Sequence, residues 1–90
     1  MTLPRYAVRV DRSAAAIVEV LRAAGFHVEL LKVPCDALCS RHGHWHCVEL
    51  KSGKGGKLTP AQVRFRDRAR APLVVLRDVD AALDWVATVP

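Results

Sequence analysis

The sequence has no long hydrophobic run and little cysteine. No stretch approaches the roughly 20 apolar residues of a membrane-spanning helix, so we expect no membrane partner. Residues 1–5 lack the apolar segment of a secretory signal peptide. The three cysteines are an odd number in a short chain, which argues against a disulfide framework. Together these absences predict a cytoplasmic protein.

Acidic residues are fewer than basic residues. The sequence also has no internal repeat, low-complexity tract or linker. The 90 residues include 14 Lys and Arg against 9 Asp and Glu, which gives a net charge of +5. A small basic domain favours a polyanionic partner, with nucleic acid the first candidate; the alternative is a merely soluble basic protein. Because 51% of the residues are hydrophobic, the chain is expected to be globular.

The spacing of apolar residues predicts three helices and four strands. Helices are expected over residues 11–24, 60–70 and 79–87. Strands are expected over residues 26–33, 35–40, 44–51 and 73–76, and residues 1–10 also show a partial alternation typical of extended chain. The order of helix, three strands, helix, strand and helix predicts a small α/β sandwich with a mixed sheet. We expect a single domain over residues 1–90.

Residues with special backbone preferences mark the ends of these elements. Gly25 suits the C-terminal stop of the first helix, and Gly43 suits the turn of a hairpin between the second and third strands. Thr59 and Gln62 form a capping box at the start of the second helix. Asp78 is expected to cap the last helix.

An acidic and basic motif ends the third predicted strand. Glu49-Leu50-Lys51 follows Asp36, with thirteen residues from Asp36 to Glu49, and the expected hairpin sets these two carboxylates side by side. Side chains alternate along a strand, so Lys51 projects from the same face as Glu49. Two carboxylates can hold a hard divalent cation, and a lysine beside them suits hydrolysis of a phosphodiester. The alternative is that these are unrelated surface charges.

A glycine- and lysine-rich loop over residues 52–58 follows the motif. It does not satisfy the phosphate-binding P-loop pattern, because Leu58 stands where serine or threonine is required. We expect Lys54 and Lys57 to contact a DNA backbone. A solvated loop without a ligand is the alternative.

Four arginines recur at every second position of the helix that follows this loop. Arg64 and Arg68 share one face of the helix, and Arg66 and Arg70 share another. We assign Arg64 and Arg68 to DNA binding. The other pair would contact Asp67 or a partner chain.

Cysteine and histidine are concentrated around the predicted hairpin, which raises the alternative of a zinc site. Their spacing is not that of a standard zinc finger. Cys35 and Cys39 would lie about 13 Å apart on a regular strand, too far for one ion. The cluster consists of Cys35, Cys39, His42, His44, His46 and Cys47. A polar hairpin exposed to solvent is the simpler interpretation.

Several segments accompany the acidic and basic motif in a definite order. They are the helix at residues 17–25, Lys57-Leu58-Thr59-Pro60-Ala61-Gln62, and residues 73–83. With them, the stretch from Asp36 to Trp85 resembles the VRR-NUC (virus-type replication–repair nuclease) branch of the PD-(D/E)xK nucleases. The resemblance implies a restriction-endonuclease-like core and an Mg²⁺- or Mn²⁺-dependent, structure-specific endodeoxyribonuclease that cuts branched or flap-like DNA. The small stand-alone members that it is similar to are phage or bacterial homodimers.

The same resemblance implies roles for individual residues. Asp36, Glu49 and the backbone carbonyl of Leu50 would bind the metal ion. Lys51 would orient or polarise the attacking water, and Gln62 would belong to the same catalytic site.

The sequence departs from the family's pattern in the first helix. Ala14, Ala15 and Ala16 occupy a stretch where an acidic or amide residue often contributes to the metal site, and Cys35 separates Pro34 from the aspartate. A non-catalytic nucleic-acid-binding module and a zinc-stabilised interaction domain are therefore retained as alternatives.

The sequence has more large apolar side chains than one small core can easily bury, which agrees with a homodimer. They are Trp45, Phe65, Trp85 and the C-terminal residues 86–89. We expect a twofold interface that buries a tryptophan side chain.

Overall fold

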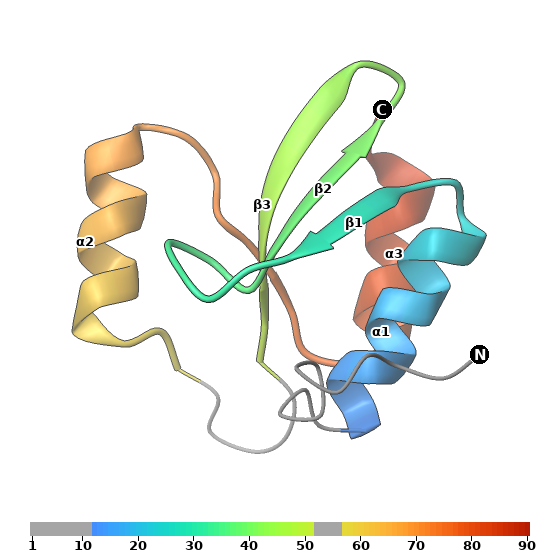
Figure 1. The fold of residues 1–90 in the computed structure, drawn as a ribbon, viewed down its shortest axis with the longest axis horizontal. Coiled ribbons are helices and arrows are strands. Elements are labelled where there is room, and N and C mark those ends of the chain that lie inside the picture. The colour runs from blue at the N-terminus through green and yellow to red at the C-terminus, as the bar shows by residue number, and fades with distance from the viewer. Residues whose placement is uncertain (1–11, 52–56) are drawn as a thin grey trace.

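A computed structural model gives the fold of residues 12–51 and 57–90 (Figure 1). The expected extended segment over residues 1–10 and the loop residue Lys54 lie outside the described residues. The elements are α1 (Arg12–Ala23), β1 (His27–Leu30), β2 (Ala37–Arg41), β3 (His44–Leu50), α2 (Pro60–Ala69), β4 (Val74–Leu76) and α3 (Val79–Thr88). This is the predicted α/β order of helix, three strands, helix, strand and helix. None of the helices in the described ranges is long and apolar enough to cross a membrane.

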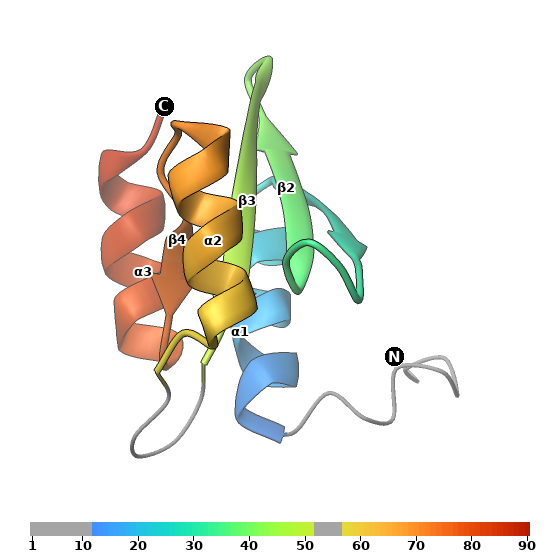
Figure 2. The same ribbon diagram turned by 90° about the vertical axis from the view of Figure 1, so that its left-hand side faces the viewer.

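The four strands form one mixed sheet in the order β1-β2-β3-β4. The β1–β2 and β2–β3 pairs are antiparallel, and β3–β4 is parallel. Helices α1 and α3 lie together on one side of the sheet, whereas α2 lies on the other side (Figures 1 and 2). The result is an α/β sandwich with a mixed sheet, as the sequence predicts, and its helices cover both faces of the sheet (Figure 2).

The hydrophobic core lies between the sheet and the pair α1 and α3. Ile17 and Leu21 of α1 are fully buried, as the helical spacing of the apolar residues predicts. Burial of one such side chain contributes about 1.5–3 kcal/mol. The other core residues are Val18, Phe26, Val28, Ala37, Cys39, Val48, Leu76 and Ala82. In contrast, α2 has no buried residue, so this helix does little to form the core.

Local signals fix the ends of the helices as expected. Gly25 adopts a φ of 93°, and the Phe26 amide donates to the Leu21 carbonyl at 3.0 Å, which closes α1 in a Schellman motif. The Asp78 carboxylate accepts a hydrogen bond from the Ala81 amide at 2.7 Å and caps α3. Helix α2 begins with the predicted capping box.

Arg41, at the end of β2, joins the two core helices. Its guanidinium donates to the carbonyl oxygens of Ala24, Val86 and Val89 at 3.0–3.2 Å, and it lies 4.3 Å from the ring centroid of Phe26. A charged donor thus satisfies carbonyls at the C-terminal ends of both α1 and α3. No local sequence pattern predicts this role of Arg41.

The prediction for the segment after α1 is wrong at its C-terminal end. Strand β1 stops at Leu30, and residues 31–34 form a loop. The Leu31 amide donates to the Asp36 carbonyl at 2.7 Å, so the chain turns back toward β2 at this point. Strand β4 lies at the edge of the sheet, and only Leu76 of its three residues is buried.

Candidate active site

The β2–β3 hairpin brings Asp36 and Glu49 together. His42 and Gly43 form its turn with φ values of 54° and 80°, as a tight hairpin requires. The last registered pair toward the open end is Ala37 with Val48, so Asp36 and Glu49 are the next residues on the two strands. The Leu50 amide donates to Asp36 Oδ2 at 2.9 Å and fixes the aspartate beside Glu49.

Glu49 is the one buried charged side chain among the described residues, with only 1% of its surface exposed. Its Oε2 accepts a hydrogen bond from Gln62 Nε2 at 3.0 Å, and Lys51 Nζ lies 3.9 Å from the same oxygen. Its Oε1 is buried without a hydrogen-bond partner. A buried carboxylate oxygen without a partner is costly, so an ion or a proton at this atom would stabilise the site.

The pKa of Glu49 reflects this environment. The pKa of the Glu49 carboxyl is raised to about 7, chiefly by burial and next by the neighbouring Asp36 carboxyl. Lys51 acts in the opposite direction and lowers the pKa. A buried carboxyl beside a second carboxyl and a lysine forms an environment that a divalent cation would stabilise.

Gln62 connects α2 to the carboxylates. Its Oε1 accepts from the Thr59 amide at 2.8 Å, while its backbone amide donates to Thr59 Oγ1 at 3.2 Å. Its Nε2 remains available for Glu49. One amide side chain therefore completes the capping box and orients a candidate metal ligand at the same time.

Lys51 is held by the parallel pairing of β3 with β4. Its amide donates to the Leu76 carbonyl at 3.1 Å, directly beyond the registered pair of Leu50 with Leu76. The half-buried side chain shares a strand face with Glu49. The structure thus brings Asp36, Glu49, Lys51 and Gln62 to one end of the sheet.

These residues fit a single hard cation. Mg²⁺ and Mn²⁺ take carboxylate and carbonyl oxygens, keep bound water and need few protein ligands. Within residues 12–51 and 57–90, no third His, Cys, Asp or Glu joins the two carboxylates. Ala14 is buried in α1 and supplies no carboxylate. The partnerless oxygen of Glu49 is the observation that favours an ion here, with the Leu50 carbonyl as the predicted further ligand.

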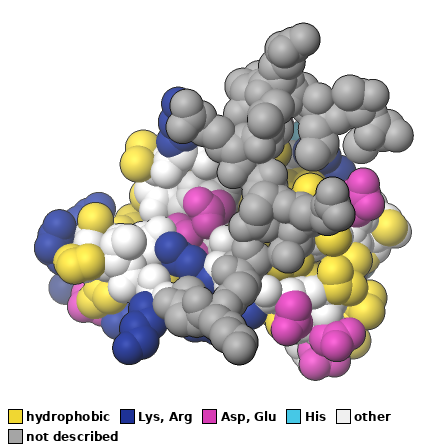
Figure 3. Space-filling view, turned by 90° about the horizontal axis from the view of Figure 1, so that it is seen from below, with side chains coloured by type: hydrophobic (Ala, Val, Ile, Leu, Met, Phe, Trp, Pro, Cys, Tyr) yellow, Lys and Arg dark blue, Asp and Glu magenta, His cyan; other side chains and the backbone are white. Residues whose placement is uncertain are grey.

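Exposed basic side chains lie on α2 and in the segment that precedes it. Lys57, Arg64 and Arg68 are exposed, whereas Lys54 is outside the described residues. Figure 3 looks onto this end of the molecule; it shows acidic side chains near the centre, with Lys and Arg side chains beside them and toward the α2 side. Arg66 contacts Asp67 at 3.4 Å, as was expected for the pair not assigned to DNA.

The Cys and His residues of the hairpin do not gather into a metal site in the described structure. Cys35 and Cys39 are buried, and His42 and His44 are exposed. His46 instead packs edge-on against Trp85, with ring centroids 5.1 Å apart. Burial lowers the pKa of this histidine, which favours the neutral ring in this packed position.

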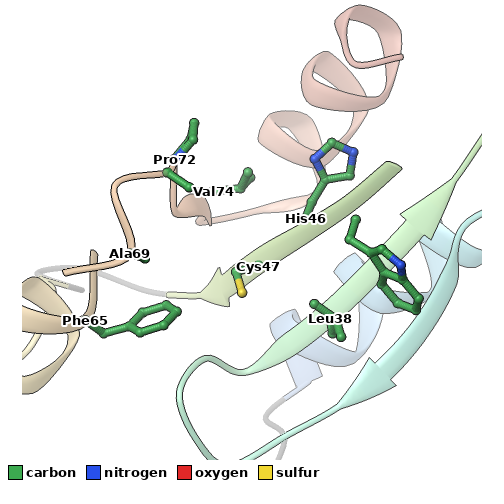
Figure 4. Close-up of a pocket in the computed structure, with 9 residues that line it drawn as sticks. Leu38, His46, Cys47, Phe65, Ala69, Pro72 and Val74 are labelled. Atoms are coloured by element: carbon green, nitrogen blue, oxygen red, sulfur yellow. The ribbon is translucent and has the colours of Figure 1, made fainter. Parts of the chain in front are cut away.

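An apolar pocket of about 220 Å³ lies between α2 and the sheet. Figure 4 shows Phe65 of α2 directed toward Cys47 of β3 and Leu38 of β2, with Ala69, Pro72 and Val74 along one side. Trp45 lines the pocket and is 61% exposed. The α2 face of the sheet is therefore incompletely covered.

Comparison of the chain with models of protein families, with curated proteins and with solved structures found no match.

Proposed function

We propose that the protein is an Mg²⁺- or Mn²⁺-dependent endodeoxyribonuclease that hydrolyses phosphodiesters in branched or flap-like DNA. The observation that carries the proposal is the buried Glu49 carboxylate with a partnerless oxygen beside Asp36. Lys51, 3.9 Å from Glu49, adds the cation expected at a reacting phosphate. The preference for branched DNA comes from the resemblance to VRR-NUC domains.

Each residue has a defined task in this mechanism. Asp36 and Glu49 would hold the ion, which when bound stabilises developing charge on phosphate oxygens and lowers the pKa of water. Gln62 keeps Glu49 oriented through its 3.0 Å hydrogen bond. The Lys51 ammonium would bind the scissile phosphate or the attacking water and offset the charge that develops in the transition state.

The DNA backbone would cross the end of the sheet and continue along α2. Lys57, Arg64 and Arg68 are exposed on this path; Lys54, which the sequence also assigns to DNA binding, lies outside the described residues. Arg68 lies 5.7 Å from the centroid of the Phe65 ring, which holds its guanidinium near the helix surface. Such contacts position a duplex without reading its sequence.

A cleavage assay tests the proposal. Purified protein is incubated with a labelled four-way junction in Mg²⁺, in Mn²⁺ and in EDTA, and compared with Asp36→Asn. Asp84→Asn is the matched control, because Asp84 is an exposed carboxylate of α3 on the far side of the sheet. Metal-dependent cutting lost only in Asp36→Asn is expected. Equal cutting by Asp36→Asn and the wild type refutes the site.

A non-catalytic nucleic-acid-binding module is the second candidate. The buried Ala14 favours it, since this alanine stands where the resemblance expects a further polar ligand. Junction binding without cutting in either metal would support this candidate over the nuclease.

We also propose that the active unit is a homodimer. The apolar pocket beside α2 and the exposed Trp45 at its edge lie on the same surface. In a twofold dimer, Trp45 of one copy can enter the pocket of the other, and both contacts form at once. Burial of a tryptophan in this way would also cover the sheet face that α2 leaves open.

A further inference from the structure

The loop at residues 31–34 presents an apolar tip beside the candidate active site. Val33 is 80% exposed, the highest value among the large hydrophobic residues in the described ranges, and Leu31 and Pro34 are exposed as well. None of the three belongs to the core cluster. Single exposed apolar residues are normal on a protein surface, whereas three in one short loop form an apolar patch.

The base of this loop is firmly attached, although its tip is exposed. The Leu31 amide donates to the Asp36 carbonyl at 2.7 Å. Cys35 is buried, and its thiol donates to the Ala37 carbonyl at 3.3 Å. Figures 1 and 2 show the loop projecting from the sheet on the side where α2 lies. The loop is therefore anchored at its base, and its apolar tip projects from it.

The tip also lies close to the proposed cut. Val33 is three residues before Asp36, so their Cα atoms are at most about 11 Å apart. Successive base pairs of DNA are about 3.4 Å apart along the helix axis. A phosphate at Asp36 would therefore lie within about three base steps of Val33. The exposed Lys32 beside the tip supplies a charge for the adjoining phosphates.

We infer that Val33 and Pro34 form a wedge that enters a base step of bound DNA within about three steps of the cut phosphate. The inference rests on the proposed function and extends it to the choice of substrate. Apolar side chains between bases must offset the loss of stacking, which is smallest where a mismatch, nick or branch has already opened the step. The wedge thus makes an opened step the preferred substrate of this site.

Cleavage of matched substrates tests the wedge. One duplex is compared with the same duplex carrying a single mismatch, and the ratio of the two cutting rates is measured. Val33→Ser should reduce this ratio about tenfold, equivalent to about 1.4 kcal/mol, while Val33→Ile keeps it. Leu83→Ser is the control, because Leu83 is 49% exposed but lies on α3, across the sheet.

Fluorescence gives a readout that does not require cutting. A 2-aminopurine is placed within three steps of the cut, and Ca²⁺ replaces Mg²⁺. The wild type and Val33→Ile should raise the fluorescence of the unstacked base. Val33→Ser should not raise the fluorescence. This variant should still bind the DNA and keep a melting temperature close to that of the wild type, because Val33 is exposed.

The outcomes separate the wedge from the nuclease. If the wild type cuts DNA and Val33→Ser matches it in ratio and fluorescence, the wedge alone is refuted. If the protein never cuts DNA but the fluorescence still depends on Val33, the wedge is supported and the proposed nuclease activity is refuted. If Val33→Ser instead halves the mass in light scattering and leaves the fluorescence unchanged, the tip is a contact between copies and the inference is overturned.

Discussion

Replacement of Glu49 by glutamine should stabilise the metal-free protein at alkaline pH. The carboxyl is buried, and its pKa is raised from 4.5 to about 7. A raised pKa means that the folded state binds the proton more tightly than the unfolded state. Stability is therefore lost as the pH rises from about 4.5 to about 7 and stays reduced above this range. Glutamine keeps the shape and removes the charge.

The size of the effect follows from the shift. One pKa unit corresponds to about 1.4 kcal/mol, so the ionised Glu49 costs up to about 3 kcal/mol at pH 8 but only about 1 kcal/mol at pH 5. Urea denaturation in EDTA should show Glu49→Gln gaining about 2–3 kcal/mol over the wild type at pH 8. The melting temperature should rise by about 10–20 °C.

A matched control separates charge burial from a general effect of glutamine. Glu29→Gln changes an exposed carboxylate on β1 and should shift stability by less than about 0.5 kcal/mol. Mn²⁺ should stabilise the wild type through binding to the folded state and leave Glu49→Gln unchanged. The reasoning is refuted if Glu49→Gln gains nothing at pH 8, or gains as much at pH 5 as at pH 8.

Three further predictions concern metal, chemistry and assembly. In calorimetry, the Asp36→Asn/Glu49→Gln double variant should lose Mn²⁺ binding by at least about a hundredfold, because both carboxylates are gone; unchanged affinity would contradict the metal site. Lys51→Ala should bind a four-way junction within about threefold of the wild type but lower its cleavage at least about a hundredfold; wild-type cutting would show that Lys51 is not catalytic. Light scattering at micromolar concentration should give twice the chain mass of 9.9 kDa, and Trp45→Ser should return the monomer; a wild-type mass of one chain would exclude the dimer.

The parts of the fold that follow from local signals could be predicted from the sequence. The Thr59 capping box, the Asp78 cap and the Gly25 stop each depend on residues within one turn of the helix end. The meeting of Asp36 with Glu49 was also predictable, because a tight turn at Gly43 fixes the register of the hairpin.

Features that depend on distant contacts could not be predicted. Residues 26–33 alternate like a strand, but β1 ends at Leu30, and the Leu31 amide bonds to the Asp36 carbonyl at the base of the loop that follows. The two tryptophans are equivalent in the sequence, yet Trp85 stacks on Phe26 at 5.1 Å while Trp45 is exposed. The partnerless oxygen of Glu49 depends on where three separate elements pack. No local pattern carries that information.

The double use of Gln62 has a consequence for the behaviour of α2. The helix has no buried residue, and Gln62 contributes both to its cap and to its hydrogen bond with Glu49. Any event that changes the protonation or ligation of Glu49 therefore changes the free energy with which α2 is attached to the sheet. Linkage is reciprocal, so a DNA backbone that holds the arginines of α2 in place would also favour the ionised, metal-binding form of the carboxylate. Substrate and metal ion would then bind cooperatively, with the first turn of α2 as the element that both of them stabilise.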